Sequence, residues 1–262
     1  MTIYSKITKN GNNNAEKLPS VAMLFNGRIF ENEIEGYETL NVSGRETVSY
    51  STTTAGNSNE ILTKELEARV LTIEYRLKAD DNTEFQEKFR KLNELLETED
   101  EDVEIRFIDD IEIEYQGQLT AISEVPPESN NVISTFEIYC ADPWKEENEL
   151  VTAGNPTQIY MKSIYKTKPK RIELTLKSAT NKITVDNLTT GRHIILDGNY
   201  RSGDKIVIEI PENKITQNGQ NIMSDLNYVE TDFHKFLIKT GDEIRTTPSN
   251  TEMSVVIRTR WK

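Results

Sequence analysis

The fold is decided by residues 69–96, which read RVLTIEYRLKADDNTEFQEKFRKLNELL. The first ten of these residues alternate between apolar and polar side chains, with Leu71, Ile73, Tyr75 and Leu77 in one phase. A period of two places one set on the buried face of a sheet and the other set in water. These ten residues therefore predict a half-buried strand.

A helix is expected directly after this strand, over residues 83–97. Thr83 and Gln86 have the spacing of a capping box, in which two side chains satisfy backbone N–H groups at the start of a helix. Apolar residues then recur every three or four positions and form one stripe: Phe85, Phe89, Leu92 and Leu96. We expect the stripe to face the sheet first and a neighbouring subunit second, so Phe85 and Phe89 are candidate subunit-interface residues.

The chain after the helix predicts further strands. Apolar residues alternate in residues 103–108, 111–115 and 136–140, and this part ends at Asp142-Pro143-Trp144. Cys140 is in phase with the apolar residues before it, which favours a buried structural thiol over a reactive one. Several strands and one helix predict an α+β unit, because one helix can cover one open sheet face.

Two turns and a polar stretch precede this unit. Asn26-Gly27 predicts a β-hairpin, because both residues tolerate the positive φ of a type I′ turn. Gly44-Arg45 indicates a second turn. Residues 51–60 are almost free of apolar side chains, which predicts either a mobile loop or an extended arm that becomes ordered against a partner. The candidate interface residues of this stretch are Ser51, Thr52, Thr53 and Thr54.

The C-terminal part has a different pattern. Residues 145–149 are charged and are interpreted as a connector, which divides the chain into domains 1–145 and 146–262. Beyond the connector, short alternating segments are separated by turn signals such as Asp197-Gly198 and Asn218-Gly219. Strands at this spacing, without a convincing helix, are typical of a β-sandwich.

Composition limits the class of protein. A length of 262 residues favours two domains, with a single large β domain as the alternative. The single cysteine excludes an intrachain disulfide. No apolar run is long enough for a membrane span, and the polar first 20 residues lack a signal-peptide core, so we expect a protein that stays in the cytoplasm or leaves by lysis.

The formal net charge of −13 predicts a surface that repels nucleic acid and anionic membranes. In an oligomer, the same charge would keep DNA from adhering to the wall of a central channel.

Residues that carry out chemistry are sparse. His193 and His234 are the two histidines, and neither has a Cys or carboxylate at zinc-site spacing. The sequence contains no glycine-rich phosphate loop and no nucleophile elbow. The acidic run 97–104 lacks the central glycine of a calcium loop, so a solvated turn is favoured. We therefore expect no catalytic residue, no metal ligand and no cofactor.

Several segments, taken in order, carry a resemblance to a known family. They are the strand at 68–78, the helix at 83–96, the strand at 103–108, Tyr-Gln-Gly at 115–117 and Phe-Glu-Ile-Tyr-Cys-Ala-Asp-Pro-Trp at 136–144. This order resembles the distal tail proteins of long-tailed, non-contractile phages, which often have an aromatic residue, a Cys and Asp-Pro-aromatic at the last point.

Other parts of the chain extend the resemblance. Leu-Phe-Asn-Gly at 24–27 and the Gly44-Arg45 turn are similar to the family. Residues 232–244 are also similar, although Thr240 and Asp242 depart from the family's usual Pro-Gly-Asn.

The resemblance implies a structural hub and not an enzyme, in a short form without an inserted carbohydrate-binding module. It implies that domain 1–145 forms a homohexameric ring and that domain 146–262 is a galectin-like sandwich. The implied partners are further copies of the chain, the tail tube protein, a tail-tip protein (a tail-associated lysin or fibre) and a receptor-binding protein. The implied location is the tail tip of a phage or prophage virion made in the bacterial cytoplasm, with DNA passing through the ring without stable binding and no membrane partner.

Carbohydrate recognition at the host surface is the alternative function, and it depends on the C-terminal sandwich. Galectin-like sugar sites use His, Asn, Arg and Trp on one sheet face, and Arg192 and His193 share a plausible strand. No Trp is near them in sequence, so we expect sugar binding to be lost or absent. Trp144 and Pro143 are instead candidate domain-junction residues, because a Trp at such a place more often packs than binds sugar. An enzyme of unknown type has the least support.

Overall fold

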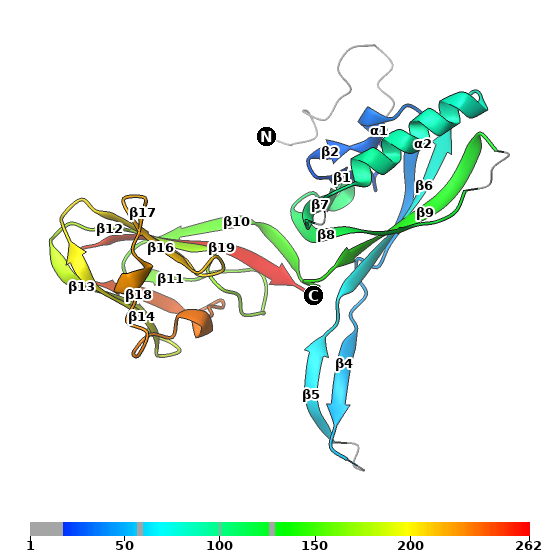
Figure 1. The fold of residues 1–262 in the computed structure, drawn as a ribbon. Helices are drawn as coiled ribbons and strands as arrows, with labels where there is room; N and C mark the ends of the chain where they lie inside the picture. Colours follow the sequence, from blue (N-terminus) through cyan, green and yellow to red (C-terminus); the bar gives the residue numbers. More distant parts are fainter. Residues whose placement is uncertain (1–17, 57–59, 100, 126–128) are drawn as a thin grey trace. The chain divides into compact units, whose positions relative to one another are not determined.

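The computed structural model describes residues 18–56, 60–99, 101–125 and 129–262 (Figure 1). The chain divides into two compact units: unit 1 is Met1–Lys145 with Lys262, and unit 2 is Glu146–Trp261. Antiparallel strands are the main secondary structure of both, which confirms the predicted mostly β fold with a helix in its N-terminal part. Residues 1–17, which contribute to the signal-peptide argument, lie outside the described residues.

Seven strands of unit 1 follow one antiparallel path, in the order β3-β6-β9-β8-β7-β1-β2. Their bounds are β1 (Met23–Phe25), β2 (Arg28–Ile29), β3 (Tyr37–Ser43), β6 (Arg69–Lys78), β7 (Val103–Phe107), β8 (Ile113–Ile122) and β9 (Asn131–Cys140). Strand β8 joins the two halves of the path, because residues 115–117 pair with β7 and residues 118–122 pair with β9. The 3-10 helix η2 (Ile108–Asp110) connects β7 to β8.

Helix α2 (Asn82–Leu96) covers one face of this sheet (Figure 1). Its residues Phe85, Leu92, Leu95 and Leu96 are buried in the same core as the predicted inward face of β6, whose Leu71 is fully buried. Phe89 is partly buried against this core. The predicted apolar stripe therefore faces the sheet. No helix in the described part of the chain is long and apolar enough to cross a membrane.

The predicted cap of this helix is wrong. Asp81 is the N-cap residue, and its Oδ1 accepts a hydrogen bond from the Glu84 backbone N–H at 2.9 Å. The Glu84 carboxylate in turn accepts one from the Asp80 backbone N–H at 2.6 Å. This reciprocal pair lies two residues upstream of Thr83 and Gln86, because a carboxylate accepts the charge-assisted hydrogen bond at a helix N-terminus more strongly than a hydroxyl does.

A second helix, α1 (Phe30–Glu33), is missed by sequence analysis, because four residues are too few to show a helical period. Phe30 is fully buried and belongs to a row of rings whose successive centroids lie 5.5 to 5.8 Å apart. These rings tie α1 to four strands of the sheet, and in order they are Phe25, Phe30, Tyr37, Tyr75 and Phe136.

The stretch predicted as a mobile loop or an extended arm belongs to a β-hairpin. Strand β4 (Tyr50–Thr54) pairs with β5 (Ile61–Leu66), and the register sets Tyr50 opposite Leu66. The loop alternative is wrong, because the apolar pair Ile61 and Leu62 begins a second strand just beyond the polar residues. Residues 57–59 lie outside the described residues. We call Tyr50–Leu66 the arm.

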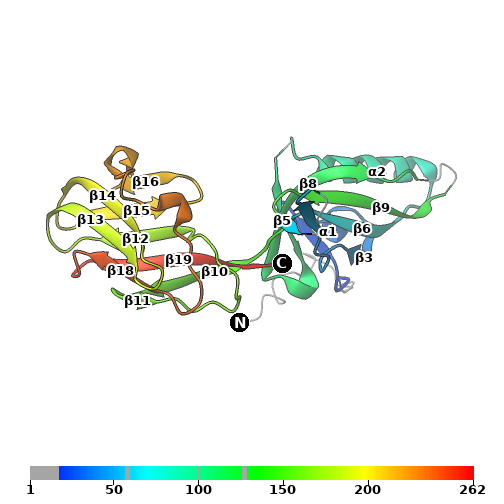
Figure 2. The same ribbon diagram turned by 90° about the horizontal axis from the view of Figure 1, so that it is seen from below.

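Unit 2 is a sandwich of two antiparallel sheets, as predicted (Figure 2). One sheet has the order β17-β16-β15-β12-β19-β10, and the other has the order β11-β18-β13-β14. Apolar residues from both sheets, many of them isoleucines, form one core between them. The strands are β10 (Lys145–Ala153), β11 (Thr157–Gln158), β12 (Arg171–Thr175), β13 (Thr180–Asn187), β14 (Arg192–Tyr200), β15 (Lys205–Glu209), β16 (Lys214–Gln217), β17 (Gln220–Asn221), β18 (Glu243–Thr247) and β19 (Glu252–Trp261). The 3-10 helices η3 (Met223–Asp225) and η4 (Phe233–Lys235) lie between β17 and β18 in the chain.

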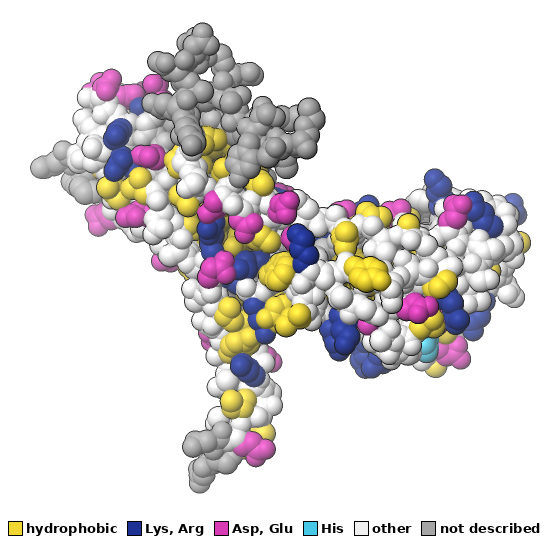
Figure 3. Space-filling model, turned by 180° about the vertical axis from the view of Figure 1, so that it is seen from behind, with side chains coloured by type: hydrophobic (Ala, Val, Ile, Leu, Met, Phe, Trp, Pro, Cys, Tyr) yellow, Lys and Arg dark blue, Asp and Glu magenta, His cyan; other side chains and the backbone are white. Residues whose placement is uncertain are grey.

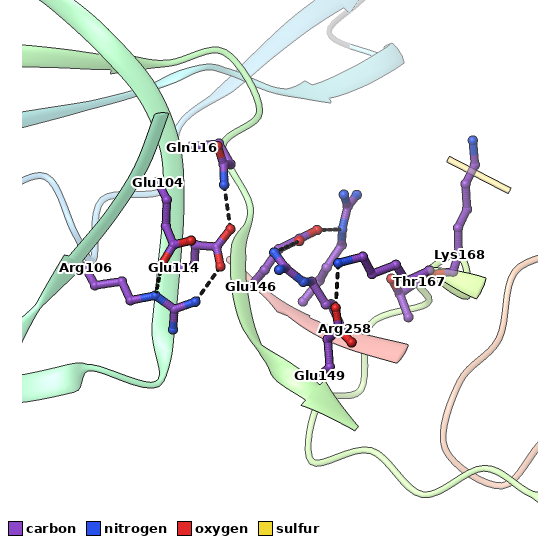
Figure 4. Close-up of polar contacts among 11 residues, drawn as sticks. Glu104, Arg106, Glu114, Gln116, Glu146, Glu149, Thr167, Lys168 and Arg258 are labelled. Atoms are coloured by element: carbon purple, nitrogen blue, oxygen red, sulfur yellow. Dashed lines mark hydrogen bonds and ion pairs between the residues drawn. The ribbon is translucent and has the colours of Figure 1, made fainter. Parts of the chain in front are cut away.

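Residues 145–149, predicted as a charged connector, begin strand β10, and the division between the two units falls between Lys145 and Glu146. Their charges are compatible with a strand because the neighbouring strand β19 carries arginines. Glu146 Oε1 accepts a hydrogen bond from Arg260 Nε at 2.7 Å, and its Oε2 lies 3.5 Å from Arg258 (Figure 4).

Three of the four predicted glycine turns are confirmed, and one of them is the turn at Gly44-Arg45. Asn26-Gly27 and Asn218-Gly219 have positive φ at both residues and connect paired strands. Asp197-Gly198 is not a turn, because it lies within β14. A Cβ at Gly198 would lie 2.4 Å from the Tyr200 hydroxyl, so the glycine makes room for the buried tyrosine.

Replacing the observed cap should destabilise unit 1, and replacing the predicted cap should not. Asp81→Ala removes the acceptor for the Glu84 N–H, so we expect it to lower the free energy of unfolding by about 1 kcal/mol. Thr83→Ala is the matched control, with an expected change below about 0.5 kcal/mol. Urea unfolding followed by helical circular dichroism measures both, and a larger loss for Thr83→Ala would show that the cap is assigned wrongly.

Candidate functional site: the arm and its base

The arm is nearly all surface. Apart from half-buried Tyr50 and Leu66, every described residue of β4 and β5 is exposed, including Ile61 at 55% and Leu62 at 61% (Figure 3). Among the described strands, β4 and β5 pair only with each other, so each has one edge of unpaired backbone groups. Such edges readily pair with another chain. The arm therefore offers both backbone and apolar side chains to a partner.

A buried arginine holds the base of the arm. Arg69, the first residue of β6, is 5% exposed, and its guanidinium donates only to backbone carbonyls. Its Nη1 reaches the carbonyls of Gly44, Arg45 and Thr47 at 2.5 to 3.0 Å. Its Nε and Nη2 reach the Pro143 carbonyl at 3.1 and 3.0 Å. One side chain thus joins the turn that leads into the arm to the last residues of unit 1.

The turn at the base requires glycine. Gly44 has φ +90°, and a Cβ there would lie 1.9 Å from the Val70 carbonyl oxygen. That position is accessible to glycine alone, because an L side chain would be strained by φ and would collide with β6. The close approach of the turn to β6 brings its carbonyls within reach of Arg69.

Ion pairs hold the same turn from the side. Arg45 forms a two-bond pair with the Asp109 carboxylate of η2, at 2.6 and 2.7 Å, and its guanidinium lies 5.0 Å from the centroid of the Phe107 ring. This carboxylate contact raises the pKa of Arg45. Lys145 Nζ is bound to both oxygens of Glu46, at 3.0 and 2.8 Å.

A second set of polar contacts holds η2, which supplies Asp109. Arg106 of β7 donates to the Ile111 carbonyl at 2.9 Å, just after η2. It also pairs at 2.5 Å with Glu114 of β8, whose carboxylate is almost fully buried (Figure 4). Because both ends of the η2 connection are fixed, Asp109 is held in position for Arg45.

The described residues offer little for catalysis or metal binding. No group of three His, Cys, Asp or Glu side chains among them is placed to hold a metal ion. In unit 2, Arg192 is bound to Asp232, and half-buried His193 lies next to it in β14. Cys140 is buried at the end of β9, and burial raises the pKa of its thiol to about 12.

Two sequence comparisons match this chain to phage tail proteins. Residues 162–261 match the family model for the siphovirus-type tail component, C-terminal domain. The distal tail protein of Bacillus phage SPP1 is 26% identical over 221 residues, which cover 79% of this chain and 82% of that protein. The chain resembles siphophage distal tail proteins over most of its length.

Solved structures show the same fold for nearly the whole chain. The crystal structure of the SPP1 distal tail protein, described as a paradigm of the hub adsorption apparatus in phages that infect Gram-positive bacteria, superposes with a TM-score of 0.79 at 19% identity. The match covers 93% of this chain and 100% of that one. A chain of the phage P2 baseplate matches at a TM-score of 0.49 and 9% identity, too low to carry an argument.

The residues predicted to lie at subunit interfaces or at the domain junction have different surroundings. Phe85 is 3% exposed, which leaves little of its ring for a neighbouring subunit, whereas Phe89 keeps part of its surface. Ser51 to Thr54 form the exposed strand β4. Pro143 supplies the carbonyl that Arg69 binds, and Trp144 is half-buried beside it. Whether any of these residues contacts another subunit stays a prediction.

Sequence analysis missed the residues that position the arm. Arg69 is in phase with Leu71 and Ile73 on the inward face of β6, and an arginine at an inward position is a signal that could have been noticed. The partners of Arg45 and Glu46 lie 64 and 99 residues away along the chain, so no local pattern indicates them.

Replacing Arg69 by Lys should destabilise unit 1. One ammonium group cannot reach four carbonyls on two segments, so buried acceptors lose their partners, and we expect a loss of about 3 kcal/mol in the free energy of unfolding. Arg76→Lys is the matched control on the same strand, because its ion pair with Glu38 is partly exposed and should contribute less than about 1 kcal/mol. Equal losses for the two variants in urea unfolding would contradict the role of Arg69.

The Cys140 thiol should be inert in the folded protein. Because burial raises its pKa to about 12, very little thiolate exists at pH 8, and access is blocked as well. We expect no reaction with Ellman's reagent in the native protein and complete reaction of one thiol after unfolding in urea. Rapid reaction in the native state would show a reactive cysteine.

Proposed function

We propose that this chain is a structural component of a phage tail tip and that it assembles into a closed ring, as a hexamer, at the end of the tail tube. The ring joins the tube to the tail-tip apparatus that contacts the host. The single observation that carries this proposal is the arm: an exposed hairpin with two free strand edges, held at its base by a buried arginine. Its similarity to the SPP1 distal tail protein, and the hub role described for that protein, support the same function.

The arm suits a contact between unlike surfaces of neighbouring subunits. It is built on one side of unit 1, so its receiving surface must be a different part of the next copy. Head-to-tail contacts of this kind close into a ring when the rotation between subunits divides a full turn. A rigid base favours closure, because it fixes the direction of the arm before assembly and reduces the entropy lost on binding.

The proposed partners on the two faces of the ring are the tail tube protein and a tail-tip protein, either a tail-associated lysin or a fibre. A receptor-binding protein is a further proposed partner. We also propose that acidic side chains line the channel, so that DNA passes without binding. The net charge of −13 supports this, because like charge repels the phosphate backbone.

Removal of the arm tests the ring. Tyr50 and Leu66 are opposite each other in the register, so residues 51–65 can be replaced by a two-residue Asn-Gly turn without breaking any pairing outside the arm. We expect the shortened protein to keep its unfolding free energy and to lose oligomers in mass photometry at concentrations where the intact chain forms them.

A side-chain variant separates binding through the exposed apolar side chains of the arm from binding through its unpaired strand edges. Ile61→Asp with Leu62→Asp keeps the hairpin backbone and removes its exposed apolar surface. Thr52→Asp with Thr53→Asp is the matched control for charge on the opposite strand. Oligomers that persist unchanged after removal of the whole arm would contradict the proposal.

A further inference from the structure

The most basic part of this acidic chain lies in unit 2. Residues 162–171 contain five basic side chains, and no acidic residue occurs between Glu149 and Glu173. The basic residues are Lys162, Lys166, Lys168, Lys170 and Arg171. In a chain of net charge −13, such a segment is a local reversal of the surface charge.

The backbone turns these lysines outward. Along 161–169 the side chains alternate, with Met161, Ser163, Thr167 and Pro169 buried and Lys162, Ile164, Lys166 and Lys168 exposed. The alternation is fixed by contacts of the inward residues: Thr167 forms a two-bond antiparallel bridge with Ile238, at 2.9 and 2.8 Å. The Ser163 hydroxyl donates to the Arg260 carbonyl at 2.6 Å.

The same bridge brings a second basic segment alongside. Thr167 is 4% exposed and Ile238 is fully buried, so the residues on either side of both must point outward. Antiparallel pairing therefore sets Lys239 beside Lys166, and Leu237 beside Lys168. We call Lys166, Lys168, Lys239, Leu237 and Ile164 the basic strip.

The centre of the basic strip is not neutralised by the protein itself. Lys162 and Lys170, which lie on either side of Lys166 and Lys168 in the sequence, pair with Glu147 at 2.7 Å and Glu149 at 2.5 Å. The ammonium groups of Lys166, Lys168 and Lys239 have no ion-pair partner among the residues that the structure describes. Figure 4 shows the Lys168 side chain directed away from Thr167, Glu149 and Arg258.

Apolar side chains interrupt the charges. Ile164 is 83% exposed and Leu237 is 36% exposed. A site for a phosphate polymer would favour arginines, whose planar guanidinium binds phosphate through two hydrogen bonds, and would gain nothing from exposed isoleucine. Lysines interleaved with aliphatic side chains instead match a protein segment that alternates acidic and apolar residues.

We propose that the basic strip is a docking site for an acidic, partly apolar segment of another protein. The lysines attract and orient the segment, and Ile164 and Leu237 bury its apolar side chains. The site lies wholly within unit 2, so it operates whether or not the arm builds a ring, and it gives the sandwich a partner of its own.

Binding of defined probes to the full-length protein tests the proposal. The probes are a fluorescent ten-residue peptide of alternating Glu and Leu, the matching Glu and Ser peptide, and inorganic polyphosphate. We expect the Glu/Leu peptide to bind about tenfold more tightly than the Glu/Ser peptide in fluorescence anisotropy, and both affinities to fall as salt increases.

Charge reversal locates the site. Lys166→Glu, Lys168→Glu and Lys239→Glu together should weaken Glu/Leu peptide binding by at least about tenfold. Lys182→Glu, Lys205→Glu and Lys214→Glu form the matched control, because they make the same charge change at exposed positions of the same unit. Circular dichroism and thermal unfolding should show both variants folded.

Four results would overturn the proposal. They are failure of the Glu/Leu peptide to bind, equal loss of binding in the control variant, tighter binding of polyphosphate than of the Glu/Leu peptide, and salt-sensitive self-association that the basic-strip variant abolishes. The third would assign the strip to an anionic polymer, and the fourth to a second copy of the chain.

Discussion

A buried guanidinium with carbonyl partners is the interaction on which the rest of unit 1 depends. Burial of a charge is costly unless it is hydrogen-bonded, and each guanidinium nitrogen of Arg69 donates to a carbonyl, with four carbonyls from two distant segments. Neither segment could supply this set alone. The turn at 44–47 and the chain at Pro143 are therefore held by the same side chain, and loss of that side chain would release both. This explains why Gly44, which allows the turn to approach β6, lies where no other residue fits.

This constraint determines how the arm can be exposed and still ordered. A two-stranded hairpin in water is marginally stable by itself. Here its base is held by Arg69, by the Arg45–Asp109 pair and by the Lys145–Glu46 pair, whereas its outer residues contact little. The direction of the hairpin is thus set by the sheet of unit 1, and its surface remains free. Such a division between a fixed base and a free surface is what an assembly protein needs.

The sequence predicted those elements whose signals are local and long. Strand β6 and helix α2 show clear periods over ten and fifteen residues, and both are found with their predicted faces inward. Helix α1 is too short to have a period, and β10 carries charges that are explained only by arginines on β19, more than 100 residues later. The cap was misplaced because Thr83 and Asp81 both fit the local rule, and only the start of the helix decides between them.

The candidate site is harder to predict from the sequence than the fold, because its contacts join residues that lie far apart in the chain. The resemblance drew attention to Gly44, Arg45, Pro143 and Trp144, but not to the arginine that connects them, because that connection exists only in three dimensions. The basic strip is similar. The five basic residues of segment 162–171 are visible in the sequence, yet their alternation with buried neighbours and the approach of Lys239 depend on the bridge between Thr167 and Ile238. In both places a buried contact fixes which side chains face outward, so the surfaces available for assembly follow from the packing beneath them.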